Sequence, residues 1–291
     1  MFETLTPVVV PVAIAIAIGY VWKKAQWPYN TDMVSRLIMW VGAPCLIVSV
    51  LVESDVSQSV LEQIFWVSLC LLGATAFVGL VILLAFKLPV RHFLVPLVFP
   101  NAGNMGLPVC LFAFGDQGLV YALAIFMVFS FLHFTVGVAL LSGQSVVKET
   151  FRNPIIWAIL LALYLIYGQI SLPLWAQNTV SNLGGFTIPL MLITLGVSLA
   201  DLSLNNFFKG AFLALLRLLI GVAVGWGVAE SFGLQGVAKG VTILQSAMPV
   251  AVFNYLFALR YSRDPQTVAS MVFVSTLASF ILIPAVLLYI I

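Results

Sequence analysis

The chain has 291 residues, of which 63% are hydrophobic and only 8% are charged, and its formal net charge is +2. Soluble proteins contain roughly 25% charged residues, so this composition excludes a water-soluble globular protein. The small net charge gives no reason to expect a nucleic acid partner. We therefore expect an all-α polytopic membrane protein that is surrounded by a lipid bilayer, with no cofactor or metal.

Apolar runs near the ~20 residues that cross a bilayer predict ten transmembrane helices. Their predicted ranges are 6–22, 34–52, 62–86, 93–114, 119–142, 154–168, 177–199, 209–230, 236–259 and 268–290. Eleven of the twelve Lys and Arg residues lie in alternate loops or at adjoining helix ends, and only Lys239 lies on the opposite side. Cytoplasmic loops of membrane proteins are rich in Lys and Arg, so the loops after helices one, three, five, seven and nine are predicted to be cytoplasmic. With ten helices, both termini are then predicted to be extracytoplasmic.

Weak internal similarity divides the chain near its middle, at the polar segment 143–153. Pro189 lies 145 residues after Pro44, and Pro249 lies 141 residues after Pro108, in similar local sequences. The prediction is a first repeat at 1–148 and a second at 149–291, which together form one membrane domain. Five helices per repeat make the second copy enter the membrane in the opposite sense, so the repeats are inverted.

The fourth and ninth predicted helices are both interrupted. Residues 98–109 contain two prolines, two glycines and two asparagines, and residues 245–250 contain a second proline-bearing interruption. Because proline suits the first turn of a helix, new half-helices are predicted to begin at Pro108 and Pro249. Their N-termini would converge near the midplane, where free amide groups and the helix dipoles favour an anion such as a carboxylate.

The candidate substrate-binding residues belong to these two interruptions. Asn and Gln can bind a substrate without the cost of a buried charge. Helix kinking and close packing are the structural alternatives for the prolines and glycines. The candidates are Asn101, Asn104, Gly106 and Pro108 on the first interruption, and Gln245, Ser246, Pro249 and Asn254 on or after the second.

Two ionisable residues lie inside predicted helices. His133 is near the middle of the fifth helix, where it either handles a proton, given an ordinary pKa near ~6.5, or is a neutral residue satisfied by a neighbouring helix. Arg217 is about two turns inside the eighth helix. Its side chain is expected to extend to the membrane interface, and the alternative is that it balances the charge of a substrate anion.

The chain resembles the auxin efflux carrier family, including its bacterial permeases of the malonate transporter type. The resemblance covers nearly the whole chain and is carried by residues 101–108, by residues 247–250 and by the segment 258–265. It implies a fold similar to bile acid symporters and sodium/proton antiporters, in which the broken helices four and nine cross at the substrate. It also implies substrate roles for Asn104, Pro108 and Pro249, and less directly for Asn101 and Asn254.

The sequence therefore predicts a secondary transporter that moves a small organic anion, such as a mono- or dicarboxylate, by alternating access. The alternatives are a sodium- or proton-coupled symporter of a larger organic acid, and an anion channel. No nucleophile and base with catalytic spacing are evident, so an enzyme is not expected. Proton coupling and a homodimer stay open, and the expected location is the inner membrane of a bacterium, with periplasmic termini.

Overall fold

The computed structural model describes residues 2–52, 57–142, 154–202 and 206–290. Within these residues the regular structure is helical, apart from an isolated antiparallel β-bridge between Pro100 and Val250. Seven helical stretches are long and apolar enough to cross a membrane, and α9 is a shorter apolar helix. The seven are Leu5–Lys24, Thr31–Val52, Gln58–Ala85, Ala102–Ser142, Leu174–Asp201, Phe207–Ser231 and Pro265–Ile290.

The described part of the first half contains α-helices and three short π-helical segments, labelled η. They are α1 (Phe2–Lys24), α2 (Thr31–Leu37), η1 (Ile38–Gly42), α3 (Ala43–Val52), α4 (Gln58–Ala85), α5 (Val90–Val98), η2 (Ala102–Gly106), α6 (Leu107–Leu132), η3 (His133–Gly137) and α7 (Val138–Ser142). The second half contains α9 (Pro154–Tyr167), α10 (Leu174–Gly185), α11 (Thr187–Asp201), α12 (Phe207–Ser231), α13 (Gly236–Ala247), α14 (Val252–Arg260) and α15 (Pro265–Ile290).

The stretch Ala102–Ser142 turns sharply at Gly115. Its 41 residues would measure about 60 Å as one straight helix, which is twice the ~30 Å thickness of a bilayer core. Gly115 has φ 65° and ψ −156°, a conformation that glycine adopts readily because it lacks a Cβ atom. The chain therefore changes direction inside α6, close to the predicted boundary between the fourth and fifth helices.

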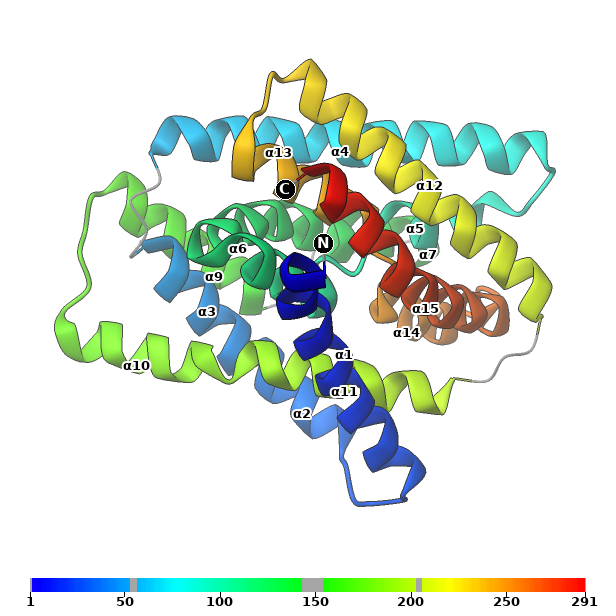
Figure 1. Cartoon of the computed structure of the whole chain (residues 1–291), viewed down its shortest axis with the longest axis horizontal. Coiled ribbons are helices and arrows are strands. Elements are labelled where there is room, and N and C mark those ends of the chain that lie inside the picture. The colour runs from blue at the N-terminus through cyan, green and yellow to red at the C-terminus, as the bar shows by residue number, and fades with distance from the viewer. Residues whose placement is uncertain (1, 53–56, 143–153, 203–205, 291) are drawn as a thin grey trace.

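Long helices surround the shorter broken ones. In Figure 1, α4 runs across the upper part of the view and α10 with α11 across the lower part, with α6 between them. α1 packs along α11, and α3 packs against α9 and α10. α12 contacts α4, α13 and α15, while α13 also packs against α6. The broken helices are thus enclosed by helices from both halves of the chain.

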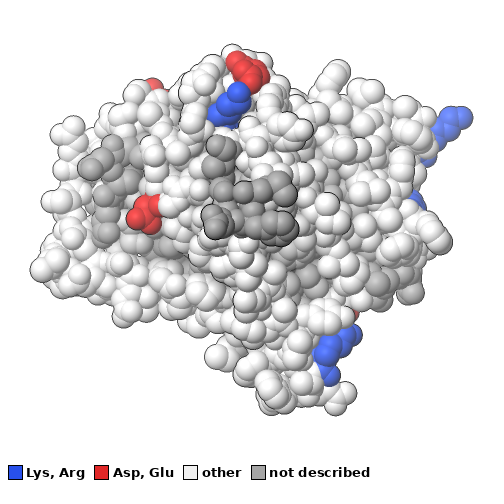
Figure 2. Space-filling model, in the orientation of Figure 1, with Lys and Arg blue, Asp and Glu red and all other residues white. Residues whose placement is uncertain are grey.

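Charged side chains are sparse on the surface. Figure 2 shows only a few widely separated Lys, Arg, Asp and Glu residues on the face in view. Lys23 pairs with Asp201 at 3.0 Å and Lys209 with Asp264 at 3.3 Å, which joins the ends of α1 and α11 and the starts of α12 and α15. Arg263 donates to the Leu141 carbonyl at the end of α7. These ends therefore lie on the same side of the helical bundle.

Some of the sequence predictions concern parts of the chain outside the described residues. The proposed repeat boundary between residues 148 and 149 lies there, as do Lys148 and Arg152.

Candidate functional site

The two chain breaks lie against each other. The amide of Asn101 donates to the Pro249 carbonyl at 2.7 Å, and the amide of Ala251 donates to the Phe99 carbonyl at 3.5 Å. These bonds flank the bridge between Pro100 and Val250. Two extended segments that would each leave unpaired backbone groups in an apolar interior thereby satisfy part of each other's hydrogen-bonding demand.

Each break begins at the residue before a proline. Phe99 directly follows α5, has ψ 107° and precedes Pro100. Met248 directly follows α13, has ψ 148° and precedes Pro249. The proline ring crowds the preceding residue and disfavours its helical conformation, so it pushes that residue toward extended backbone. The sequence thus stops both helices by the same local mechanism.

The predicted α-helical start at Pro108 is confirmed to within one residue, although a π-helical segment precedes it, and the predicted start at Pro249 is wrong by three residues. Helical turns resume at Ala102, six residues before Pro108, because η2 precedes α6. Pro108 lies in the first turn of α6, where it is buried. Pro249 lies inside the extended break, and α14 begins three residues later at Val252. Proline at these positions therefore marks the neighbourhood of a helix start, not the start itself.

A cavity of about 70 Å³ lies beside the two helix starts. It exceeds the ~30 Å³ that one water molecule occupies in the liquid. The lining is mostly apolar and aromatic, and it comes from α2, α3, the three π-helical segments, α6, α9, α11, α14 and both breaks. Its polar side chains are Ser35, Asn101, Asn104, Ser130, His133 and Thr194. The lining contains no Lys, Arg, Asp or Glu among the described residues, so His133 is the lining residue that can carry a charge.

All three π-helical segments of the described chain meet at this cavity. Ile38 comes from η1, Asn104 from η2 and His133 from η3, and each lines the cavity. π-Helical turns are less stable than regular turns and are frequent at functional sites. Their convergence marks this cavity as the candidate site.

The cavity receives hydrogen-bond donors from the start of η2. The first backbone bonds of this segment run from Met105 and Gly106 to the Asn101 carbonyl, at 3.3 and 3.0 Å. The amides of residues 102–104 precede these bonds, and those three residues line the cavity. Nδ2 of Asn101 is also buried, and it has no hydrogen-bond partner among the described residues. Such donors favour an anionic group.

The start of α14 adds a second helix N-terminus to the same cavity. Ala251, which precedes α14, and Phe253 in its first turn both line the cavity. The first backbone bond there runs from the Asn254 amide to the Ala251 carbonyl at 3.0 Å. Two positive dipole ends therefore lie beside one small cavity, as the sequence predicts.

Asn254 lies behind the cavity and connects its two sides. Its Nδ2 donates to the Phe99 carbonyl at 2.9 Å, and its Oδ1 lies 2.8 Å from Nε2 of His133. The His133 ring stacks on Phe99, with centroids 4.3 Å apart and planes tilted by 8°. His133 thus has a polar partner on a neighbouring helix, and it also lines the cavity.

The second interruption does not bring Gln245 and Ser246 to the cavity lining. Gln245 is fully buried and donates to the Ala122 carbonyl at 3.4 Å. A Cβ atom on Gly106 would collide with the Gln245 amide, so this glycine permits close contact between η2 and α13. Gly106 and Gln245 therefore pack against each other where the two broken helices meet.

The expected extension of Arg217 to the interface is wrong. The residue is 1% exposed, and its Nη2 donates to the Ser246 carbonyl at 2.9 Å. Gly221, one turn further along α12, lies close enough that a Cβ atom there would meet the same carbonyl. Close packing of α12 on α13 therefore keeps the guanidinium inside, near the C-terminal end of α13, where the helix dipole favours a positive charge.

Sequence reasoning missed Ser35, Ser130 and Thr194 as lining residues. Ser130 precedes His133 by three residues, a helical spacing that places both on one face and was a usable signal. Thr194 bonds to the Tyr29 hydroxyl at 2.7 Å. Burial raises the pKa of Tyr29 despite this bond, so the phenol keeps its proton near neutral pH. Only the tertiary structure brings Tyr29 and Thr194 together.

Comparisons with known proteins identify the class of protein to which this site belongs. A family model described as membrane transport protein matches residues 4–146 and 138–290. An uncharacterized transporter of Methanothermobacter thermautotrophicus is 27% identical over 98% of both chains. An uncharacterized transporter of Methanocaldococcus jannaschii is 24% identical over 95% of this chain and 96% of its own.

A plant protein is similar over a shorter region. Auxin efflux carrier component 1 of Arabidopsis thaliana is 28% identical over 125 residues, which are 42% of this chain and 20% of the plant protein. The family and its relatives are membrane transporters and not enzymes, and the apolar helices agree with a multi-pass integral membrane protein. The chain therefore belongs to the membrane transport protein family, which is the auxin efflux carrier family that its sequence resembles.

Proposed function

We propose that this protein is a secondary transporter that moves a small organic anion, a mono- or dicarboxylate, by alternating access. The observation that carries the proposal is the cavity beside the two breaks, where the unpartnered side-chain Nδ2 of Asn101 and two helix N-termini offer donors. A carboxylate accepts several hydrogen bonds at once, and bonds to charged groups are stronger than those between neutral groups. Asn104 lines the same cavity and is the second side chain proposed to bind the substrate.

The other predicted residues have indirect roles in this proposal. Pro249 binds the Asn101 amide through its carbonyl, and Asn254 holds the Phe99 carbonyl, so both fix the shape of the first break. Gly106, Gln245 and Ser246 maintain the contacts among η2, α13 and α12. Pro108 shapes the first turn of α6. These residues are proposed to position the donors, whereas Asn101 and Asn104 contact the anion.

We also propose ten membrane crossings in two inverted repeats. Gly115 divides the longest stretch into two crossings, the first of which includes α5. α13 and α14 form one interrupted crossing, and α9 forms a short one. The helix contacts support a correspondence between the repeats in which α1 matches α9 and α3 matches α11. α1 packs on α11 as α9 packs on α3, and α4 packs on α5 as α12 packs on α13. Such a repeat is a common architecture for alternating access.

The proposed location is the inner membrane of a bacterium. The ends that carry Lys23, Lys209 and Arg263 gather on one side through their contacts with Asp201, Asp264 and the Leu141 carbonyl. By the positive-inside rule this side is cytoplasmic, and both termini are then periplasmic.

Uptake into proteoliposomes tests the proposed function. Labelled malonate, malate and oxalate are supplied to the wild type and to the variants Asn101→Ala, Asn104→Ala and Asn182→Ala. Asn182 is an exposed residue of α10 outside the cavity lining and serves as the matched control. A lost hydrogen bond to a charged group costs about 1.5–3 kcal/mol, so the apparent affinity is expected to fall at least about tenfold in the first two variants.

Three results would overturn different parts of the proposal. Saturable uptake that is unchanged in both cavity variants would show that the anion binds elsewhere. No uptake of any of the three acids by a folded wild type would exclude small dicarboxylates of two to four carbons of this type as substrates. Non-saturable flux through all variants would favour a channel over a carrier.

A further inference from the structure

The contacts of Asn254 determine the tautomer of His133. The Phe99 carbonyl can only accept a hydrogen bond, so the Asn254 atom 2.9 Å from it must be the amide nitrogen. The Asn254 atom 2.8 Å from Nε2 of His133 is then the carbonyl oxygen, which can only accept. Nε2 must therefore carry hydrogen, and Nδ1 is the ring nitrogen that is left to take up a proton.

We propose that His133 is the proton-binding residue of this transporter and that it accepts a proton at Nδ1 when a carboxylate occupies the cavity. The inference rests on the proposed function, because it assumes that the cavity binds an anion. His133 lines that cavity together with Asn101 and Asn104, so a protonated ring lies beside the anion site. Asn254 keeps the Nε2 hydrogen in place in both protonation states.

Aromatic rings surround His133 and support its charged form. Phe99 presents its face to the imidazole at 4.3 Å, and Phe257 meets the ring edge to face at 5.3 Å. The face of an aromatic ring carries negative partial charge and attracts a cation, most strongly where water is excluded. Protonation therefore gains a cation–π contact with Phe99 as well as attraction to the substrate.

The described contacts of His133 include no titratable or charged side chain. They come from Phe99 in the first break, from Asn254 and Phe257 in α14, and from Phe134 and Gly137 of its own segment. The charged residues at the ends of these elements are Arg260, the last residue of α14, and Arg263, which donates to the Leu141 carbonyl in α7. The substrate is therefore the counter-charge that the cavity can supply to protonated His133.

The proton step is balanced without any further reactant. A proton from the aqueous phase forms a bond to the Nδ1 lone pair, and the Nε2–H bond is kept. The imidazolium cancels one negative charge of the bound carboxylate, which lowers the cost of moving the anion through an apolar region. On the other side of the membrane the anion leaves, and Nδ1 returns its proton to water.

NMR tests the tautomer independently of transport. The chain contains only two histidines, His92 and His133, so ¹⁵N-histidine labelling gives two ring systems, and the variant His133→Gln assigns them. We expect His133 to show hydrogen at Nε2 and none at Nδ1 at neutral pH. Adding malonate is expected to promote protonation of Nδ1 as the pH falls toward 5. The opposite tautomer, or a ring that stays neutral at pH 5 with a transported acid bound, would overturn the proposal.

Flux measurements test the coupling. An inward acid gradient is expected to stimulate wild-type uptake several-fold. In His133→Gln the side-chain amide can still donate to Asn254 but cannot be protonated in this range, and the ratio of uptake with and without the gradient is expected to fall to about one. His92→Gln is the matched control, since His92 lies outside the cavity at the start of α5, and its ratio should equal that of the wild type.

The outcomes separate this inference from the proposed function. Saturable uptake in the wild type without stimulation by the gradient, or full stimulation in a folded His133→Gln protein, would overturn proton binding by His133 and leave the anion carrier standing. Absence of uptake by the folded wild type would instead count against the proposed carboxylate class. Gel filtration recognises a misfolded His133→Gln protein. In that case the variant Asn254→Ala replaces it. Because this variant lacks the acceptor that fixes the Nε2 hydrogen, the NMR signal of His133 is expected to show both tautomers.

Discussion

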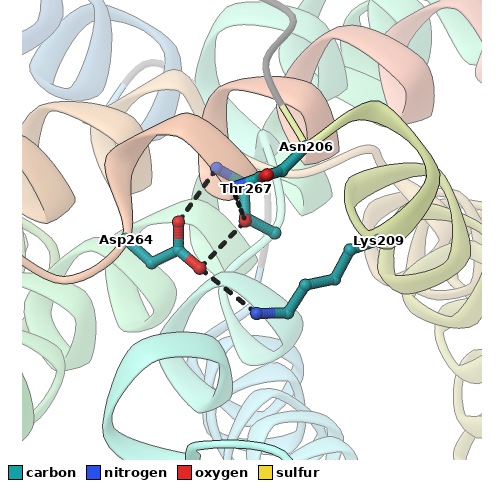
Figure 3. Close-up of polar contacts among 4 residues, drawn as sticks. All are labelled: Asn206, Lys209, Asp264 and Thr267. Carbon is teal, nitrogen blue, oxygen red and sulfur yellow. Dashed lines mark hydrogen bonds and ion pairs between the residues drawn. The ribbon is translucent and has the colours of Figure 1, made fainter.

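At the scale of single residues, Asp264 combines an unusual backbone with several polar contacts. Its φ of 49° lies in the left-handed region, which Asp and Asn tolerate better than most residues. Its carboxylate accepts from the Thr267 amide and hydroxyl at the start of α15 and from Lys209 on α12, as Figure 3 shows. Asn206 adds a bond to Thr267 at 3.4 Å. The carboxylate therefore caps α15 and ties it to α12.

These contacts predict a pH-dependent contribution to stability. Burial by itself would raise the pKa of Asp264, but the hydrogen bonds from Thr267 and Lys209 lower it below its ordinary value near ~3.9. Folding thus favours the ionised carboxylate, so the stabilisation is present above pH ~4 and is lost as the pH falls through the lowered pKa.

Thermal unfolding in detergent, measured from pH 7 down to pH 3, tests this assignment. Asp264→Ala removes the cap and is expected to cost about 1–2 kcal/mol at pH 7. Asp264→Asn keeps a capping oxygen and tolerates the left-handed backbone, so it should cost less, and its difference from the wild type should shrink as the pH falls. A difference that is constant with pH would contradict a role for the carboxylate charge.

The residues at the crossing show which parts of the site the sequence could predict. Asn101 and Asn104 were predictable because Asn between prolines and glycines in an apolar segment has few structural explanations. The placement of Gln245 was not, because residues 240–247 of α13 are buried on every face and the sequence does not say which face meets the cavity. The burial of Arg217 depends on how closely α12 approaches α13, which only the tertiary structure fixes.

At the scale of elements, the close contact between α1 and α11 depends on two glycines. A Cβ atom on Gly19 would collide with the Ile193 carbonyl, and one on Gly196 would collide with the Ile16 carbonyl. Small residues let membrane helices approach until their backbones touch, and this packing replaces the hydrophobic effect, which is weak between helices in lipid. The two glycines thus join the first helix of the chain to the second half.

Gly19→Ala is therefore expected to destabilise the protein, whereas Gly73→Ala is not. The added methyl group at Gly19 has a backbone carbonyl in its way, so α1 must shift, at a cost of about 1–3 kcal/mol. A Cβ atom on Gly73 in α4 would have no neighbour within 4 Å, and alanine favours the helix there. Equal unfolding temperatures of the two variants in the same detergent would argue against backbone contact between α1 and α11.

Helix boundaries were harder to predict than the helices themselves. The apolar runs predicted the long helices well, since length and hydrophobicity suffice for that. The π-helical segments η1 and η3 were not predicted, because their sequences do not differ in kind from those of regular helix. The segment that contains η2 was predicted as an interruption, but its sequence does not say that the chain makes a π-helical turn there before α6 begins at Leu107.

At the scale of the whole molecule, the cavity lies on the side where the Lys and Arg residues gather. Ser35 lines it one residue before Arg36, and Thr194 in its lining bonds to Tyr29, in the loop that follows Lys23 and Lys24. On the other side of the crossing, Met105 packs near Ser279, whose hydroxyl lies 3.7 Å from its sulfur. For the proposed carrier, with the side rich in Lys and Arg taken as cytoplasmic, we propose that this arrangement is the state that opens toward the cytoplasm.

Thiol labelling in a variant without Cys45, Cys70 and Cys110 tests this conformation. A membrane-impermeant maleimide applied to inside-out vesicles is expected to label Ser130→Cys in the cavity and Arg91→Cys in the first turn of α5, but not Gln235→Cys before α13. In right-side-out vesicles the pattern should reverse. A transported carboxylate should slow labelling of Ser130→Cys only, because that side chain lines the cavity.

The same experiment distinguishes a carrier from a channel. In a carrier each conformation opens the cavity to one side, so a substrate that shifts the population changes the side from which Ser130→Cys is labelled fastest. In an open channel the cysteine would react from both sides at similar rates, with or without substrate. If Ser130→Cys were labelled only from the side that labels Gln235→Cys, the protein would rest in the outward-open state. That result would contradict the proposed state that opens toward the cytoplasm.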